Sequence, residues 1–237
     1  MSSDALSNLG SESRTFAPSA EFAAAANAQP GLYAEASADR LAFWAKQAER
    51  LDWAEPFTQV LDWSNAPFAR WFVDGKLNVA YNCVDRHVEA GYGGQVAIRF
   101  EGEPGDSREI TYAELTAEVK KAANVLIELG IRAGDRVAIY MPMIPEAIVA
   151  MQAVARIGAV HSVIFGGFSA ESLHTRIDDA QAKLVITADG GYRKGKASAL
   201  KPAVDEAIKG ETNVAQVLVV KRTGQETAWV EGRDLWW

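Results

Sequence analysis

Several features that define common classes of protein are scarce in this sequence. Cys83 is the only cysteine, so neither an intramolecular disulfide nor a cysteine-based zinc site can form within these 237 residues. The three histidines, His87, His161 and His174, lack the spacing of a metal-ligand motif. We therefore predict no metal site in this chain.

Long hydrophobic runs and an excess of basic residues are also missing. The most apolar stretch, residues 144–157, is interrupted by Glu146, Gln152 and Arg156 and is shorter than a membrane span. The 24 Lys and Arg residues are outnumbered by 31 Asp and Glu residues, which gives a net charge of −7. An acidic chain has no long-range attraction for nucleic acid or anionic membranes. With no secretory signal at its start, the sequence predicts a cytoplasmic protein that binds neither nucleic acid nor membrane.

Large apolar side chains are distributed unevenly and divide the chain into three predicted regions. Residues 1–35 are rich in Ala and Ser and predict a disordered leader. Residues 36–95 carry four of the seven tryptophans, which predicts an aromatic-rich extension that packs onto a larger body. A nucleic-acid stacking platform is the alternative, but it would need interleaved Lys and Arg. Residues 96–237 predict part of a larger α/β domain.

From Val96 onward, the hydrophobic periodicity alternates between that of strands and that of helices. We predict strands at 96–100, 109–111, 136–140, 160–165, 184–187 and 214–220, and helices at 112–129, 145–157, 170–180 and 202–209. Thr111 and Glu114 form a capping box for the first helix, and Gly130 suits its left-handed end. Apolar strands that alternate with helices predict the α/β class, with a mostly parallel sheet and flanking helices.

Two segments lie where open α/β sheets bind ligands, beyond the carboxyl ends of strands. The first, Phe165–Ser169, contains two adjacent glycines before a helix, which would let an anion approach the backbone; a simple tight turn is the alternative. The second, Asp189–Lys196, is a cationic loop in which Arg193 could grip a phosphate; a solvated surface loop is the alternative. His87 could be catalytic, although packing is the more common role for a lone histidine.

The cationic loop also has the spacing of a P-loop. Gly190, Gly195 and Lys196 give G-x-x-x-x-G-K after a strand, but Ala197 stands where a hydroxyl group would be needed to hold Mg²⁺. This departure disfavours a P-loop. The residues alone thus indicate an α/β protein with a candidate anion-binding loop.

Longer stretches of the sequence resemble a known family. The similarity is to the N-terminal region of the acetyl-CoA synthetases, within the AMP-forming (adenylate-forming) acyl-CoA synthetase family, and it covers residues 36–237. The stretches that carry it are Gly75-Lys76-Leu77-Asn78-Val79-Ala80-Tyr81-Asn82, Asp85-Arg86-His87, Gly134-Asp135-Arg136-Val137-Ala138-Ile139-Tyr140-Met141-Pro142 and Ala155–Phe168. Propionyl-CoA synthetases share much of this sequence, so the acyl group stays open.

The resemblance implies a fold, a reaction and its substrates. The fold would be the N-terminal part of the large domain of adenylate-forming enzymes, preceded by the extension. The reaction would convert ATP, acetate and coenzyme A to acetyl-CoA, AMP and pyrophosphate through acetyl-AMP, with Mg²⁺ as the metal ion. The partners would therefore be small molecules. Another short-chain acyl-CoA synthetase, or a fragment that only binds coenzyme A, is the alternative.

The resemblance also assigns a role to both glycine-containing segments. The family's contacts with the ADP part of coenzyme A correspond here to Arg193, Lys194, Gly195, Lys196, Phe165, Gly166 and Gly167. Lys196 stands where the family often has Arg, which keeps the charge but loses the bidentate fork.

The resemblance further implies that parts of the family's active site are missing from these residues. The family's Ser/Thr/Gly-rich phosphate loop, its acyl pocket and its catalytic lysine are not among the 237 residues. We therefore predict no catalytic residue here and expect an N-terminal fragment that is inactive alone. The uncovered apolar surface of Trp236 and Trp237 agrees with that expectation.

Overall fold

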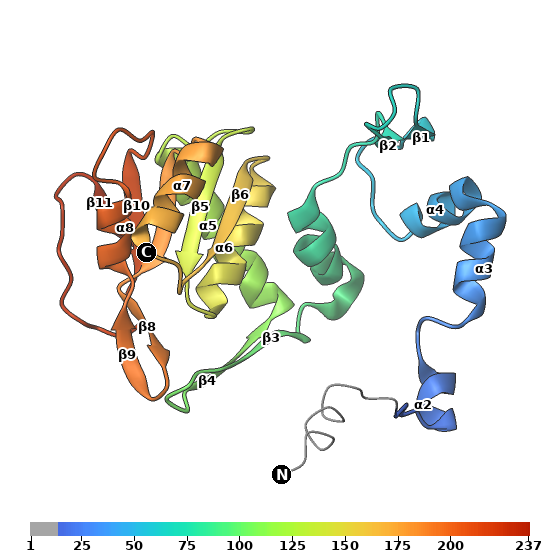
Figure 1. Cartoon of the computed structure of the whole chain (residues 1–237), viewed down its shortest axis with the longest axis horizontal. Coiled ribbons are helices and arrows are strands. Elements are labelled where there is room, and N and C mark those ends of the chain that lie inside the picture. Colours follow the sequence, from blue (N-terminus) through green and yellow to red (C-terminus); the bar gives the residue numbers. More distant parts are fainter. Residues whose placement is uncertain (1–13) are drawn as a thin grey trace, which may run out of the picture. The chain divides into compact units, whose positions relative to one another are not determined.

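The computed structural model describes residues 14–237, which form two compact units (Figure 1). The smaller unit consists of the residues up to Leu51 together with Phe57–Asp74, and the larger consists of Asp52–Pro56 and Gly75–Trp237. The first 13 residues of the predicted leader lie outside the described part of the chain. The three predicted regions, 1–35, 36–95 and 96–237, stay predictions.

From residue 14 onward, the smaller unit contains three short helices and one hairpin. They are α2 (Ala20–Ala25), α3 (Gly31–Ala38), α4 (Arg40–Ala48), and the antiparallel strands β1 (Gln59–Asp62) and β2 (Arg70–Val73). Helix α2 and part of α3 fall within the predicted leader, and neither helix buries a residue. Their alanine-rich composition favours helix without supplying a core.

Aromatic side chains of the smaller unit contact one another. The Trp44 ring meets Phe43 and Trp71 edge-on, with ring centroids 5.4 and 6.0 Å apart, and Phe57 meets Phe72 at 5.1 Å. Edge-to-face contacts of this kind are typical of aromatic packing. The aromatic-rich composition of this region therefore serves contacts within the unit itself.

The larger unit is built on a five-stranded sheet in which every pair of neighbours is parallel. The strand order is β11-β10-β7-β5-β6, and the bounds are β5 (Arg136–Met141), β6 (Val160–Phe165), β7 (Leu184–Ala188), β10 (Gln216–Val220) and β11 (Asp234–Trp236). This sheet and its flanking helices confirm the predicted α/β class. The three-residue strand β11 was not predicted.

Helices cover both faces of this sheet (Figure 1). They are α5 (Tyr112–Glu128) and α6 (Pro145–Arg156) on one face, and α7 (Ala170–Ala180) and α8 (Lys201–Ala207) on the other. Successive residues of strand β5 face the two layers in turn: Val137 and Ile139 pack with α5 and α6, whereas Ala138 and Tyr140 pack with α7 and α8. This period of two explains why the central strands are apolar throughout.

The predicted helix ends have the expected chemistry. The Thr111 hydroxyl accepts from the Glu114 N–H, and the Glu114 carboxylate accepts from the Thr111 N–H at 2.8 Å, which completes the capping box of α5. Gly130 follows α5 with a φ of 87°. The Ser169 hydroxyl likewise caps α7 by accepting from the Ser172 N–H.

Two π-helical turns, η2 (Tyr81–Asp85) and η3 (Val88–Tyr92), precede a hairpin of β3 (Val96–Glu101) and β4 (Ser107–Thr111). Both strands of this hairpin were predicted, at 96–100 and 109–111, but the π-helical turns were not. The His87 ring contacts the Tyr112 ring, with centroids 4.9 Å apart, so this histidine has a packing role.

The segment before the hairpin is attached to the end of helix α6. The Asn78 amide donates to the carbonyl groups of Ala155 and Arg156 at 3.3 and 3.1 Å. The buried Asp85 carboxylate accepts from the Arg156 guanidinium at 2.5 Å. The Asn78 amide thus adds a side-chain donor to the carbonyl groups at the end of the helix, and the Asp85–Arg156 ion pair adds a second link.

A buried ion cluster attaches strand β11 to helix α8. The fully buried Lys201 ammonium group contacts Asp234 at 2.8 Å and Asp205 at 2.7 Å, and Arg233 contacts Asp234 at 2.7 Å. Burial alone would raise the pKa of Asp234, but hydrogen bonds from Arg233, Lys201 and the Val230 N–H outweigh it and lower that pKa. The cluster therefore holds charged groups where an unpaired charge would be costly.

None of the helices in residues 14–237 is long and apolar enough to cross a membrane.

We predict that Lys201→Ala lowers the free energy of unfolding by about 3 kcal/mol, because it leaves buried carboxylates without their ammonium partner. The matched control is Lys209→Ala, which removes an exposed lysine paired with Glu206 and should change stability by less than about 0.5 kcal/mol. Urea unfolding measures both changes. Equal losses from the two variants would contradict a special contribution from the buried cluster.

Candidate anion-binding site

The cationic segment lies in a β-hairpin, which corrects the prediction of a loop. Strand β8 (Gly190–Arg193) pairs antiparallel with β9 (Lys196–Ala199). The two turn residues, Lys194 and Gly195, have φ angles of 53° and 73°, as in the two-residue turns that match the twist of paired strands. A P-loop is excluded, because Lys196 begins a strand where a P-loop would begin a helix.

The base of this hairpin is fixed by the buried carboxylate of Asp189. Its Oδ1 accepts from the N–H groups of Gly190, Arg222 and Thr223 at 2.7, 2.8 and 2.9 Å, and its Oδ2 accepts from the Gly224 N–H at 2.7 Å. Asp189 directly follows strand β7, and residues 221–224 follow β10. One carboxylate thus joins the start of the hairpin to the loop of the neighbouring strand.

Glycine is required where the hairpin and the glycine turn pack against the end of β5. A Cβ atom on Gly191 would lie 2.9 Å from Cβ of Pro142, and one on Gly166 would lie 3.1 Å from the Met141 carbonyl oxygen. Both distances are shorter than ordinary contacts between side chains and their neighbours. The hairpin and the turn therefore lie against the same carboxyl end of the sheet.

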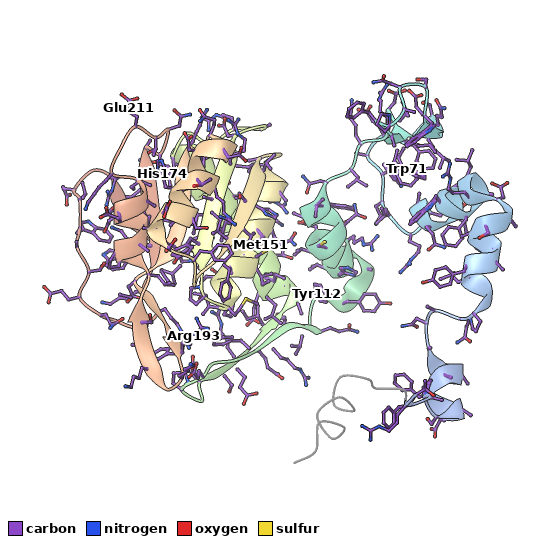
Figure 2. The ribbon with its side chains drawn as sticks, in the orientation of Figure 1. Trp71, Tyr112, Met151, His174, Arg193 and Glu211 are labelled. Atoms are coloured by element: carbon purple, nitrogen blue, oxygen red, sulfur yellow. The ribbon has the colours of Figure 1, made fainter. Side chains whose placement is uncertain are left out.

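The structure brings the two predicted segments together through Arg193, which is labelled at hairpin β8–β9 in Figure 2. A Cβ atom on Gly167 would lie 3.4 Å from Nη1 of Arg193 and 2.6 Å from the Phe165 ring, so the absence of a side chain leaves room for both groups. Arg193 is thus the cation that meets the glycine turn, whereas Lys194 and Lys196 are exposed at the hairpin turn. The result is a guanidinium group beside an exposed aromatic ring and a helix N-terminus.

A second cation, Arg222, contacts the face of the hairpin, and this role could not be predicted from the sequence. Its guanidinium makes a bidentate pair with Asp106 at 2.6 and 3.0 Å. It also lies 5.3 Å from the Phe100 ring and 5.2 Å from the Tyr192 ring. The hydrogen bonds from Arg222 lower the pKa of Asp106. This arrangement, the Arg222 clamp, links hairpin β3–β4 to hairpin β8–β9.

Comparison with known proteins places this site within a family. Residues 85–236 match the family model described as AMP-binding enzyme. The chain belongs to the AMP-binding enzyme family. Residues 30–83 match a second model, described as acetyl-coenzyme A synthetase N-terminus. These matches confirm the family that the sequence resembles, and both segments of the candidate site lie within the range matched to the AMP-binding enzyme model.

Curated relatives of the chain are described as acetyl-coenzyme A synthetases. The chain is 69% identical over 237 residues to an acetyl-coenzyme A synthetase of Streptomyces avermitilis, covering 100% of this chain and 36% of that protein. It is 69% identical over 223 residues to one of Mycolicibacterium smegmatis (94% of this chain and 24% of that protein). It is 65% identical over 228 residues to one of Mycobacterium tuberculosis (95% of this chain and 35% of that protein). The chain thus spans about a third or less of the length of these relatives.

We predict that Asp189→Ala lowers the free energy of unfolding by about 3 kcal/mol, because several buried N–H groups lose a charged acceptor. Asp179→Ala, which removes an exposed aspartate of α7, is the matched control and should change stability by less than about 0.5 kcal/mol. Urea unfolding measures the effect, and hydrogen exchange locates it. The proposed role of Asp189 is wrong if the Gly224 amide stays as protected as in the unmodified chain.

Proposed function

We propose that this chain supplies the coenzyme A side of the active site of an AMP-forming acetate–CoA ligase. The observation that carries the proposal is the position of the Arg193 guanidinium beside Gly167, within the region matched to the AMP-binding enzymes. The name acetyl-coenzyme A synthetase, which the relatives share, supports acetate as the acyl group. ATP and coenzyme A as substrates, together with a single cysteine, suit a cytoplasmic location.

In the proposed reaction, a carboxylate oxygen of acetate attacks the α-phosphate of ATP and releases pyrophosphate. The thiol of coenzyme A then attacks the carbonyl carbon of acetyl-AMP and releases AMP. Formation of the mixed anhydride converts a poor leaving group into a good one. The chain's part in this sequence is to hold the second substrate by its phosphates.

The hairpin offers suitable groups for that task. Arg193 presents a planar fork of N–H donors that can bind a phosphate bidentately, whereas Lys194 and Lys196 act as point charges. The exposed ring of Phe165 adds an apolar surface next to the guanidinium. Because the whole chain is acidic, these cations form a local attraction rather than part of a general one.

The proposal leaves the ATP side of the reaction outside these 237 residues. Among residues 14–237, no group of three or more His, Cys, Asp or Glu side chains is arranged to hold a metal ion. We therefore assign no step through Mg²⁺ to the described residues.

We predict that the double change Arg193→Ala and Lys196→Ala weakens coenzyme A binding about tenfold or more at low salt, because two charge-assisted contacts are lost. Isothermal titration calorimetry measures the affinity. The control removes two exposed lysines, Lys183 and Lys209, and so matches the loss of charge. Equal heats from the unmodified chain and the Arg193 and Lys196 variant would rule out this binding site.

We further predict that these 237 residues alone release no pyrophosphate when mixed with ATP, acetate, coenzyme A and Mg²⁺, because the family's phosphate loop is not among them. A coupled pyrophosphate assay checks this, with a full-length relative as the positive control. Steady turnover by the chain, unaffected by further purification, would show that the ATP side is present after all.

A further inference from the structure

The tip of hairpin β8–β9 already binds an anion that belongs to the protein itself. The carboxylate of Glu103, in the turn between β3 and β4, accepts a hydrogen bond from the Gly195 N–H. The tips of these two hairpins lie side by side in Figure 1. Lys194 and Lys196 flank Gly195 in the chain. A carboxylate therefore occupies an N–H donor that lies between two lysines in the chain.

The position of Glu103 is set by the Arg222 clamp. Asp106, three residues further along the same turn, is bound bidentately by Arg222, which also contacts Tyr192 of strand β8. Gly102 leaves room for that pair, since a Cβ there would lie 2.0 Å from Oδ1 of Asp106 and 2.6 Å from Nη2 of Arg222. The clamp thus holds the turn and the hairpin together independently of the Glu103 contact.

We propose that Glu103 is a built-in competitor for the anionic ligand of the hairpin. Its carboxylate holds the Gly195 N–H in the free protein, and a phosphate group of the ligand displaces it. This inference rests on the proposed function of the hairpin. A carboxylate and a phosphate both accept hydrogen bonds from N–H donors, so the two groups compete for the Gly195 N–H.

The contact is suited to displacement because both of its partners are exposed. Exposed charged contacts contribute little net stability, so a phosphate that gains Arg193 and the two lysines can replace the carboxylate. The clamp would stay in place during this exchange, since it involves other side chains. Glu103 would therefore tune affinity and salt dependence without changing the hairpin.

The test compares Glu103→Gln with the unmodified chain in coenzyme A titrations at low salt. We expect the affinity to rise about twofold to fivefold, the range for removal of one exposed charged contact, and the gain to shrink as salt is added. Glu101→Gln, which removes the same charge two residues earlier on strand β3, should give less than half of that gain. No gain from Glu103→Gln, or an equal gain from both variants, would overturn the proposal.

A second measurement separates this inference from the proposed function. Inorganic phosphate is titrated while the amide resonance of Gly195 is followed by NMR, which requires no coenzyme A binding. The resonance should respond at a lower phosphate concentration in Glu103→Gln than in the unmodified chain. If coenzyme A does not bind but this difference appears, the proposed function fails and the competitor stands. Identical phosphate curves would refute the competitor even where coenzyme A binds.

Discussion

The four backbone N–H groups that converge on the buried carboxylate of Asp189 determine the geometry of the candidate site. They join the end of strand β7 to the loop after β10, and they fix the direction in which the hairpin leaves the sheet. Because Arg222 is one of these residues, its guanidinium is positioned to bind Asp106 and to lie between Phe100 and Tyr192. The orientation of the cationic hairpin thus depends on one buried acidic side chain, Asp189, which is not among the proposed ligand-binding residues.

Much of the fold could be predicted from the sequence because the relevant forces are local and periodic. Short sequence segments are enough to recognise the capping box of Thr111 and Glu114 and the apolar central strands. Strand β11 escaped prediction because it is only three residues long and its pairing with β10 depends on the distant Lys201 ion cluster. The two π-helical turns were not predicted, because the apolar spacing that identifies helices has a period of 3.6 residues and π-helical turns depart from it.

The candidate site residues were named from the sequence and stay a prediction, whereas their arrangement in space could not be predicted. The pairing of Arg193 with Gly167 depends on how two strand ends lie in space, and no pattern in the sequence reports that distance. The Arg222–Asp106 contact joins residues 116 positions apart. The hairpin itself was mistaken for a loop because Lys194 takes a positive φ, which is uncommon for a residue that has a Cβ.

The glycines of the candidate site show that a role in ligand binding and a role in packing are compatible. Gly166 and Gly191 are crowded by the Met141 backbone and by Pro142, so packing favours glycine at both positions, whereas Gly167 is crowded only by the side chains of Phe165 and Arg193. The missing side chain of Gly167 leaves the space that the Arg193 guanidinium occupies beside the glycine turn. Carboxylates thus contact the cationic hairpin at its base, through the buried Asp189, and at its tip, through the exposed Glu103. The candidate anion site is thus a local cationic feature of a chain whose net charge opposes general binding of polyanions.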